Sequence, residues 1–538
     1  MRRRFVAGLF LLALLMVAAA CTYAFWPRSP QSEPGIAIQS AGDVPADVMA
    51  DVREAAAGVS CLAADAGVPL AHGVTLFVAP TQEDYERVLT QQFSHSEEEA
   101  AKISAISGGW TGGKQGKTAL NGAAGVMQDR SGRMSTTAHE LFHQLQYDLS
   151  HGNDAAEQAL FWLEEGSADY VGALVAEQCG GKSLHKWEQD TMFDLRRAQE
   201  TVNAKELVHC SPQRRMQLME KKYHSYQLAD AMVICLVQKQ AKGTELAAIV
   251  RYFQALADTR SGEEAFSKAF GMTHAQFLQE FQQWYVQERH LPFAAHVIAR
   301  PGVSAALAAD VKTQAAAVQP MLAGMYGQRL CGRYDLILAA DAADFIQAIA
   351  ENCAVTQDKA RELATGSLWI QDGSTIIVQA GELGDGKQRI FSVGALCARL
   401  LETQVADKRE ESVAWLDRGM IYLAGIRALE QAGQGRYADY RRGWQQAVRR
   451  AGAVPSLEQL LTADGMREAS ESYGDDIVNE LAEFAADELM TRFGWSSYRA
   501  YLQQVRRLGS EREAFREVYG RDTAAYAREL ELARTSRR

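Results

Sequence analysis

Proline is scarce in this chain, at 11 of 538 residues, and no run of basic residues follows the first four positions. Proline interrupts helices, so its scarcity in an alanine-rich chain indicates a mainly helical protein. The formal net charge is −11, and without a basic face the chain is not expected to bind nucleic acid. Its length exceeds what one hydrophobic core usually supports, which predicts two to four domains.

The first 26 residues have the pattern of a targeting segment: Arg2–Arg4, an apolar stretch from Phe5 to Ala20, then Cys21. Three outcomes stay open. Ala18–Cys21 is similar to a bacterial lipoprotein box, although an alanine replaces the usual leucine, and cleavage there would leave Cys21 lipidated. Alternatively, the segment is long enough to anchor the chain in a bilayer, or it is removed in simple secretion. Each outcome exports the rest of the chain, which predicts the periplasmic side of a bacterial cell envelope.

If the chain is exported, its remaining cysteines can form disulfides, because oxidising compartments permit them. Cys179 with Cys210, and Cys331 with Cys353, are candidate local pairs. Seven cysteines follow Cys21, so at least one is unpaired or pairs with another chain: Cys61, Cys179, Cys210, Cys235, Cys331, Cys353 and Cys397.

An HExxH motif, His139 to His143, lies in a segment with helical apolar spacing. Residues four apart share a helix face, so both imidazoles can address one ion. Imidazole nitrogen is a common zinc ligand, and catalytic zinc sites usually have three protein ligands. Glu140, next to the first histidine, can act as a general base on a water molecule. The motif therefore predicts a catalytic zinc site.

A second segment, Trp162 to Tyr170, supplies a third ligand on a following helix. We assign this role to Glu165, with Glu164 as the alternative. Asp169 shares the face of Glu165 and is placed to accept a ring N–H from a ligating histidine. HExxH followed by W-x-x-E-G-x-A-x-Y resembles the gluzincin metallopeptidases, the clan similar to thermolysin and aminopeptidase N.

The resemblance covers roughly residues 45 to 288. It implies a zinc metallopeptidase domain with a small N-terminal sheet, a helical C-terminal part and an edge strand that holds a peptide substrate. Tyr226 matches a tyrosine of peptidase-MA-like domains that faces the zinc, which makes it the candidate donor to the oxyanion. Tyr223 and His224 stay open as neighbours. The glycine-rich stretch 108–116 is expected to be a surface loop, with a flap over the cleft as the alternative.

The second half repeats landmarks of the first. Trp415 to Gly419 matches Trp162 to Gly166, and the helix that corresponds to HExxH, Val393 to Glu402, has no histidine. Arg418 stands where the third ligand would be, and a cation there opposes metal binding. We therefore expect a tandem duplication whose second copy is degenerate.

The predicted fold is α+β and mostly helical, a gluzincin-like domain in tandem with a degenerate copy of itself. The predicted segments are residues 1–26 for targeting, 27–43 as linker, 44–290 as the metallopeptidase domain, 291–305 as linker and 306–535 as the metal-free copy.

The predicted function is an exported zinc-dependent peptidase, favoured as an endopeptidase, in which His139, His143 and Glu165 hold Zn²⁺ and Glu140 and Tyr226 are catalytic. The expected partners are a peptide or protein substrate, the membrane through the N-terminus, and a possible protein partner on the second domain. Two alternatives remain. One is an envelope scaffold protein with a non-catalytic zinc site, and the other is a zinc hydrolase of a non-peptide amide or ester.

Overall fold

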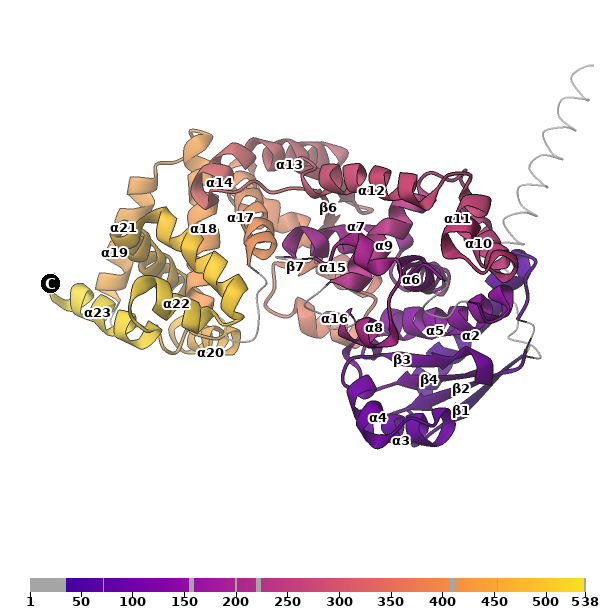
Figure 1. Ribbon diagram of the computed structural model, residues 1–538. Coiled ribbons are helices and arrows are strands. Elements are labelled where there is room, and N and C mark those ends of the chain that lie inside the picture. Colours follow the sequence, from indigo (N-terminus) through magenta and orange to yellow (C-terminus); the bar gives the residue numbers. More distant parts are fainter. Residues whose placement is uncertain are drawn as a thin grey trace, which may run out of the picture.

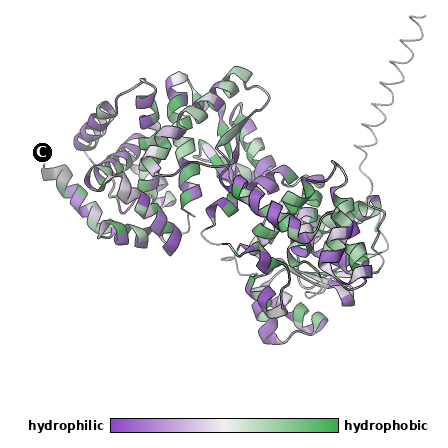
Figure 2. Cartoon of the chain, turned by 45° about the horizontal axis from the view of Figure 1, so that its top comes forward, coloured by the Kyte–Doolittle hydropathy of each residue, from purple (hydrophilic) through white to green (hydrophobic). Residues whose placement is uncertain are grey.

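A computed structural model describes residues 35–70, 72–153, 159–198, 201–218, 224–406, 413–451 and 453–536. The protein is mostly helical, with two small mixed β-sheets, and is therefore an α+β protein (Figure 1). Apolar residues gather on some faces of the helices and hydrophilic residues on others in both halves of the chain (Figure 2). Among the described residues, no helix combines the length and apolar composition needed to cross a membrane.

The first half has one four-stranded sheet, with strand order β1-β2-β4-β3. β1, β2 and β4 are parallel, and β3 is antiparallel to β4 at one edge. Its strands and helices are β1 (Ile36–Ser40), α2 (Ala46–Asp65), β2 (Val74–Ala79), α3 (Gln82–Phe93), α4 (Glu97–Ser104), β3 (Gly109–Gly112), β4 (Lys117–Asn121), α5 (Arg130–Ser150), α6 (Phe161–Gln178), α7 (Leu184–Arg197), α8 (Pro212–Leu218), α9 (Ser225–Val237), α10 (Glu245–Thr259), α11 (Gly262–Phe270) and α12 (His274–Arg289).

Both faces of this sheet are covered by helices. Side chains alternate along a strand, so Leu76 and Val78 of β2 point into the main core formed with α2, α5 and α6. Phe77 and Ala79 point to the other face, into a smaller core with α3 and α4. β2 is therefore apolar except at Thr75 and lies buried between the two helical layers.

The second half contains a sheet with the corresponding order, β5-β6-β8-β7, in which the first three are parallel and β7 is antiparallel to β8. Its strands and helices are β5 (Ala294–Ala299), α13 (Ala305–Ala317), α14 (Gln319–Tyr326), β6 (Arg333–Ala339), α15 (Ala342–Cys353), α16 (Gln357–Ala364), β7 (Trp369–Asp372), β8 (Thr375–Gln379), α17 (Gly386–Val405), α18 (Ala414–Gln431), α19 (Tyr437–Arg450), α20 (Ala463–Tyr473), α21 (Asp475–Leu508), α22 (Glu511–Tyr519) and α23 (Thr523–Ser536).

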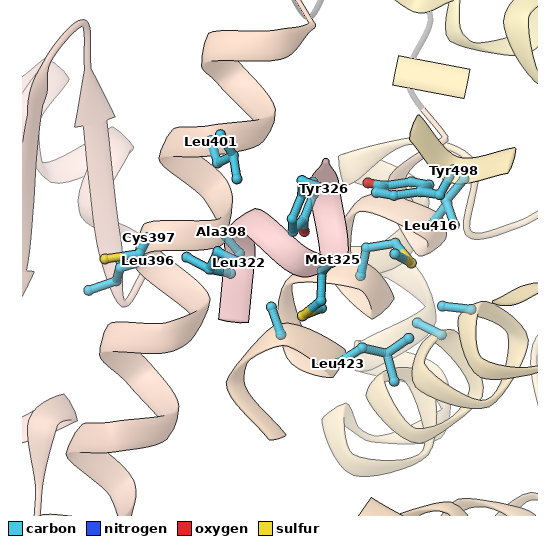
Figure 3. Close-up of a cluster of buried hydrophobic side chains, with 14 of the residues drawn as sticks. Leu322, Met325, Tyr326, Leu396, Cys397, Ala398, Leu401, Leu416, Leu423 and Tyr498 are labelled. Carbon is cyan, nitrogen blue, oxygen red and sulfur yellow. The ribbon is translucent and has the colours of Figure 1, made fainter. Parts of the chain in front are cut away.

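A large apolar core joins the helices of the second half. Figure 3 shows α14 between α17, α18 and α21, with Tyr326 and Tyr498 facing each other. Both tyrosine hydroxyls donate to Glu402 Oε1, each over 2.8 Å, in a fully buried position of α17. These hydrogen bonds offset part of the cost of burying a carboxyl group there.

Helix α7 fastens the two halves of the chain together. Phe193 of α7 is buried in the core of the second half. Lys186 Nζ lies 2.9 Å from Asp190 Oδ2 and 3.2 Å from Asp372 Oδ2 of β7. Ser374 donates to Asp190 Oδ1 over 2.9 Å. A buried aromatic ring and a largely buried ion-pair network therefore hold the halves in one arrangement.

Both segments expected to be linkers contain a strand. Residues 36–40 form β1 and residues 294–299 form β5, and each pairs in parallel with the strand that follows it. Both are edge strands with mostly exposed or half-exposed residues. An edge strand buries little, so its sequence lacks the apolar run that marks β2 or β6.

The described cysteines all have free thiols, so neither expected disulfide is formed. Cys179 Sγ lies 4.0 Å from Glu54 O, whereas Cys210 Sγ contacts Glu206 O over 2.9 Å. Proximity in sequence was the basis for pairing them, and the fold directs the two thiols to different neighbours.

Candidate metal centre

Helix α5 carries the two histidines of the HExxH motif. Its first turn is capped by Asp129, whose side chain accepts a hydrogen bond of 2.8 Å from the Gly132 N–H. Ala138, Leu141, Phe142 and Leu145 are buried in the main core. The apolar stripe thus fixes the rotation of the helix and leaves the histidines at its rim.

His139, His143 and Glu165 converge between α5 and α6. The two Nε2 atoms are 3.0 Å apart, and Glu165 Oε2 lies 3.6 Å from His139 Nε2 and 3.7 Å from His143 Nε2. Their side chains are only 12–15 % exposed. Within the described residues, this is the one group of three or more His, Cys, Asp or Glu side chains compact enough to hold a metal ion.

These separations fit a tetrahedral zinc ion. Zn–N and Zn–O bonds of about 2.0–2.2 Å at tetrahedral angles place neighbouring ligand atoms roughly 3.3–3.6 Å apart. The three observed separations, 3.0, 3.6 and 3.7 Å, scatter around that range. The donor set of two imidazole nitrogens and one carboxylate oxygen also suits zinc.

The other ring nitrogen of each histidine has its own acceptor. His139 Nδ1 lies 2.8 Å from Asp169 Oδ1, and His143 Nδ1 lies 2.7 Å from Gln146 Oε1. Gln146 in turn donates to Glu164 O over 2.8 Å. With the proton on Nδ1, each histidine donates from Nδ1 and directs the Nε2 lone pair at the point between the three ligand atoms. This is the tautomer that metal ligation requires.

The charges around the histidines favour a cation. Burial lowers the pKa of His139, but Asp169, Glu165 and Glu140 outweigh it and raise this pKa well above its ordinary value. Burial likewise opposes protonation of His143, yet Glu165 raises its pKa to about 9. Burial alone would raise the pKa of Glu165, but hydrogen bonding to the two histidines holds it far below its ordinary value. The surrounding carboxylates therefore give the site a negative electrostatic potential around the two imidazoles.

Glu140 is held by the edge strand β3. The Thr111 hydroxyl lies 2.7 Å from Glu140 Oε2 and 2.9 Å from the Glu140 carbonyl oxygen. A Cβ at Gly109 would lie 2.5 Å from Glu140 Cγ, so only glycine leaves space for this carboxylate. Burial raises the pKa of Glu140, while the two histidines and Thr111 act in the opposite direction.

The two neighbouring glutamates of α6 have different partners. Glu165 faces the histidines, whereas Glu164 forms a two-pronged pair with Arg215 of α8, with 3.1 Å between Nη1 and Oε1. Arg215 also lies over the Phe161 ring, 4.7 Å from its centroid. A Cβ at Gly166 would lie 2.6 Å from Ala229 O, so this glycine lets α9 approach α6 closely. Of the two glutamates, only Glu165 joins the cluster.

Tyr226 and Asp230 of α9 complete the surroundings of the site. Burial and the nearby Glu165 and Asp169 raise the pKa of Tyr226 well above its ordinary value, so its hydroxyl keeps its proton. Burial and Asp169 likewise raise the pKa of the Asp230 carboxyl well above its ordinary value. His224 lines the same cleft, while Tyr223 lies outside the described residues.

A cleft of about 1800 Å³ opens over the site. Strand β3 lies along it, and in the described part of the chain this strand pairs only with β4. Residues 109–112 of the glycine-rich stretch thus form an edge strand of the cleft, which differs from the loop expected from the sequence. β4 pairs with both β2 and β3 and is an inner strand. Gly109 in the strand and Gly113 just after it are needed because Glu140 and Tyr147 of α5 pack directly against these two positions.

The second half has no comparable cluster among its described residues. Arg418 of α18 donates from Nε to Asn479 Oδ1 over 3.1 Å, and Arg399 of α17 lies 3.8 Å from Asp417 Oδ2. The Arg418 guanidinium is therefore exposed and bonded to α21, whereas that of Arg399 joins α17 to α18. Arginine remains protonated, so it does not ligate zinc.

Four side chains around the site are not predicted by the sequence: Thr111, Gln146, Arg215 and Asp230. Only Gln146 has a local signal, since it lies one turn after His143 on the same helix. The other three come from elements distant in sequence. Cys21 lies outside the described residues.

Comparison of the sequence with models of known protein families and with curated proteins found no match in either case.

Proposed function

We propose that this chain is a zinc-dependent peptidase of the gluzincin type, exported to the cell envelope. The supporting observation is the trio of ligand atoms on α5 and α6 at separations suited to tetrahedral zinc, with Glu140 beside it. A structural zinc site has no need of such a base, so the presence of Glu140 favours catalysis over a scaffold role. His139, His143 and Glu165 would hold the ion.

A zinc ion at this site would supply Lewis acidity toward a carbonyl oxygen and toward a water molecule. Glu140 accepts a proton from that water at its carboxylate and later delivers it to the leaving amine. Thr111 holds the Glu140 carboxylate in place during both transfers. Asp169 holds His139 in the required tautomer and orientation.

Tyr226 would donate a hydrogen bond to the oxyanion that forms as the scissile carbonyl is attacked. The surrounding carboxylates keep its hydroxyl protonated, so it can only act as a donor there. Because it comes from α9, its position depends on the close packing of α9 against α6 at Gly166.

The shape of the cleft favours a peptide over a small amide or ester. Small-molecule pockets usually enclose about 300–1000 Å³, and this cleft has about 1800 Å³. The outer edge of β3 can pair with an extended chain through its backbone groups. An extended peptide laid along β3 would pass Glu140, which Thr111 of that strand contacts.

We further propose that the second half is a degenerate copy of the first. Both sheets have the same strand order and sense. Gly166 and Gly419 lie at corresponding helix contacts in the two halves. A Cβ at Gly166 would lie 2.6 Å from Ala229 O, and a Cβ at Gly419 would lie 2.5 Å from Ala482 O. Trp162 stacks on His274 as Trp415 stacks on Tyr526. Arg418 follows the second tryptophan at the spacing at which Glu165 follows the first.

The test is a metal analysis with a peptide-library cleavage assay on the wild-type protein, on Glu140→Gln and on Glu165→Gln. We expect about one zinc per chain and cleavage in the wild type, zinc without cleavage in Glu140→Gln, and loss of zinc in Glu165→Gln. Full zinc content without cleavage of any peptide in the wild type would favour a scaffold or a non-peptide hydrolase. For the proposed envelope anchor, mass spectrometry of the mature N-terminus would show whether Cys21 is lipidated.

A further inference from the structure

The thiol of Cys179 packs against helix α2. Cys179 caps the C-terminal end of α6. Its Sγ lies 4.0 Å from Glu54 O of α2, and a Cβ built on Gly58 would lie 3.6 Å from the same Sγ. The thiol therefore lies over the turn of α2 that joins residues 54 and 58.

Cys61 lies on the same face of α2, at the next turn. Residues 54, 58 and 61 are four and then three positions apart, the spacing that aligns side chains along one side of a helix. Neighbours at this spacing have Cβ atoms about 5–6 Å apart. The Cβ of Cys61 is therefore one such step from a point that lies 3.6 Å from Cys179 Sγ. That is within reach of a side-chain rotation at both cysteines.

Gly58 brings the two helices close enough for this contact. A Cβ at Gly58 would lie only 2.8 Å from Val175 Cγ1, one turn before Cys179 on α6. A larger residue at position 58 would push α6 away from α2 and separate the two thiols. The absence of a side chain there therefore sets the spacing at which Cys61 and Cys179 face each other.

The chemistry of the two thiols suits a structural disulfide. Both are free and partly exposed, so an oxidant can reach them, whereas Cys210 is buried. Burial, then the Glu54 carboxylate and the nearby Cys61, raise the pKa of Cys179 to about 11, although Arg130 acts in the opposite direction. A low thiol pKa is typical of catalytic cysteines, because it stabilises the reduced form. Cys179 lacks that feature.

Three helices meet at Cys179. Arg130, the first residue of α5, donates to Cys179 O over 3.1 Å and lies 2.8 Å from Glu54 Oε2. It also pairs with Asp51 of α2. Since α5 and α6 carry the three candidate metal ligands, a covalent bond between Cys179 and α2 would fix the ends of both helices.

We propose that Cys61 and Cys179 form a disulfide bond when the chain is in an oxidising compartment. The two thiols lose two electrons and two protons as their Sγ atoms join. The disulfide of the oxidant, a small-molecule disulfide or a thiol–disulfide oxidoreductase, takes up both and becomes two thiols. The bond joins α2 to the C-terminal end of α6. The proposal needs the expected export of the chain but not its peptidase activity.

The test is oxidation of the reduced full chain with glutathione disulfide, followed by alkylation of free thiols and peptide mapping by mass spectrometry without reduction. We expect a linked pair of peptides that contain Cys61 and Cys179. The two positions are 118 residues apart, and closing so long a loop restricts the unfolded chain. The melting temperature should therefore rise by about 5–10 °C on oxidation.

Cys61→Ser and Cys179→Ser should each remove both the linked peptide and the rise in melting temperature on oxidation. Cys210→Ser is the matched control and should retain both. Comparing oxidised with reduced samples of each variant separates the bond from any effect of the substitution on folding. Zinc content should be equal in the two forms, because Cys179 is about 21 Å along α6 from Glu165.

A chain in which Cys61 or Cys179 stays free, carries glutathione, or is linked to another cysteine would overturn the proposal. So would a rise in melting temperature that survives Cys61→Ser. These readouts involve no peptide substrate. Failure of the peptidase proposal therefore leaves the disulfide untouched, and absence of the disulfide leaves the metal centre as proposed.

Discussion

Replacing Thr111 with valine tests the part of the site that links the edge strand to the proposed base. Valine keeps the β-branched shape and the strand, but its methyl group cannot donate to Glu140 Oε2, now 2.7 Å from the Thr111 hydroxyl. A hydrogen bond to a charged group contributes about 1.5–3 kcal/mol. If that contribution is lost at the carboxylate that must accept a proton, kcat/KM should fall about 10- to 100-fold.

The pH dependence should change in a definite direction. The Thr111 hydrogen bond lowers the pKa of Glu140, against the effect of burial. Without it the carboxylate is protonated at higher pH, and only the ionised form accepts a proton from water. The acid limb of the kcat/KM profile should therefore move to higher pH in Thr111→Val.

Two controls make this prediction specific. Thr111→Ser retains the hydroxyl and should recover most of the activity and the original acid limb. Zinc content should be equal in wild type and both variants, because Thr111 contacts Glu140 and none of the three ligands. An unchanged kcat/KM and pH profile in Thr111→Val would refute the proposal that Thr111 of β3 holds the Glu140 carboxylate for proton transfer.

Three further predictions concern stability and ligand identity. His274 accepts a hydrogen bond from Trp162, and burial lowers its pKa to about 4. The pKa of histidine in the unfolded chain is about 6.5. The contribution of His274 to the free energy of unfolding is therefore full above about pH 6.5 and falls by up to about 3 kcal/mol as the pH drops toward 4. Urea unfolding at pH 7 and pH 4.5 should show a smaller pH effect in His274→Phe, and equal effects would contradict this. Glu164→Gln should leave Arg215 buried without its partner, costing about 3–5 kcal/mol, yet keep its zinc; loss of zinc would mean that Glu164 is a ligand. Phe193→Ala should cost about 3–5 kcal/mol and make the junction between the halves sensitive to limited proteolysis, and unchanged cleavage would argue against α7 as the fastening element.

Local patterns in the sequence predicted the main elements of the first half. Apolar spacing predicts helices over residues 47–64 and 83–92 and a strand over residues 74–80, each within one residue of the bounds of α2, α3 and β2. Histidines four apart and Glu165 a helix later are also local signals, which is why the three candidate ligands were named from sequence. The predicted roles of these residues remain predictions.

Other features depend on contacts that no local pattern records. β1 and β5 are edge strands whose exposure hides their periodicity, so their segments were expected to be linkers. Glycines in and just after β3 have the composition of a loop, yet Gly109 and Gly113 are required by the close approach of Glu140 and Tyr147. Phe193 gives no hint in sequence that its ring is buried in the core of the other half.

The most direct test of the account is X-ray absorption spectroscopy at the zinc edge on the full chain loaded with one equivalent of zinc. We expect two imidazole nitrogens and carboxylate oxygen at about 2.0–2.2 Å, and loss of one imidazole contribution in His143→Ala. Sulfur at about 2.3 Å, or a spectrum that His143→Ala leaves unchanged, would place the zinc elsewhere and contradict the metal centre on α5 and α6.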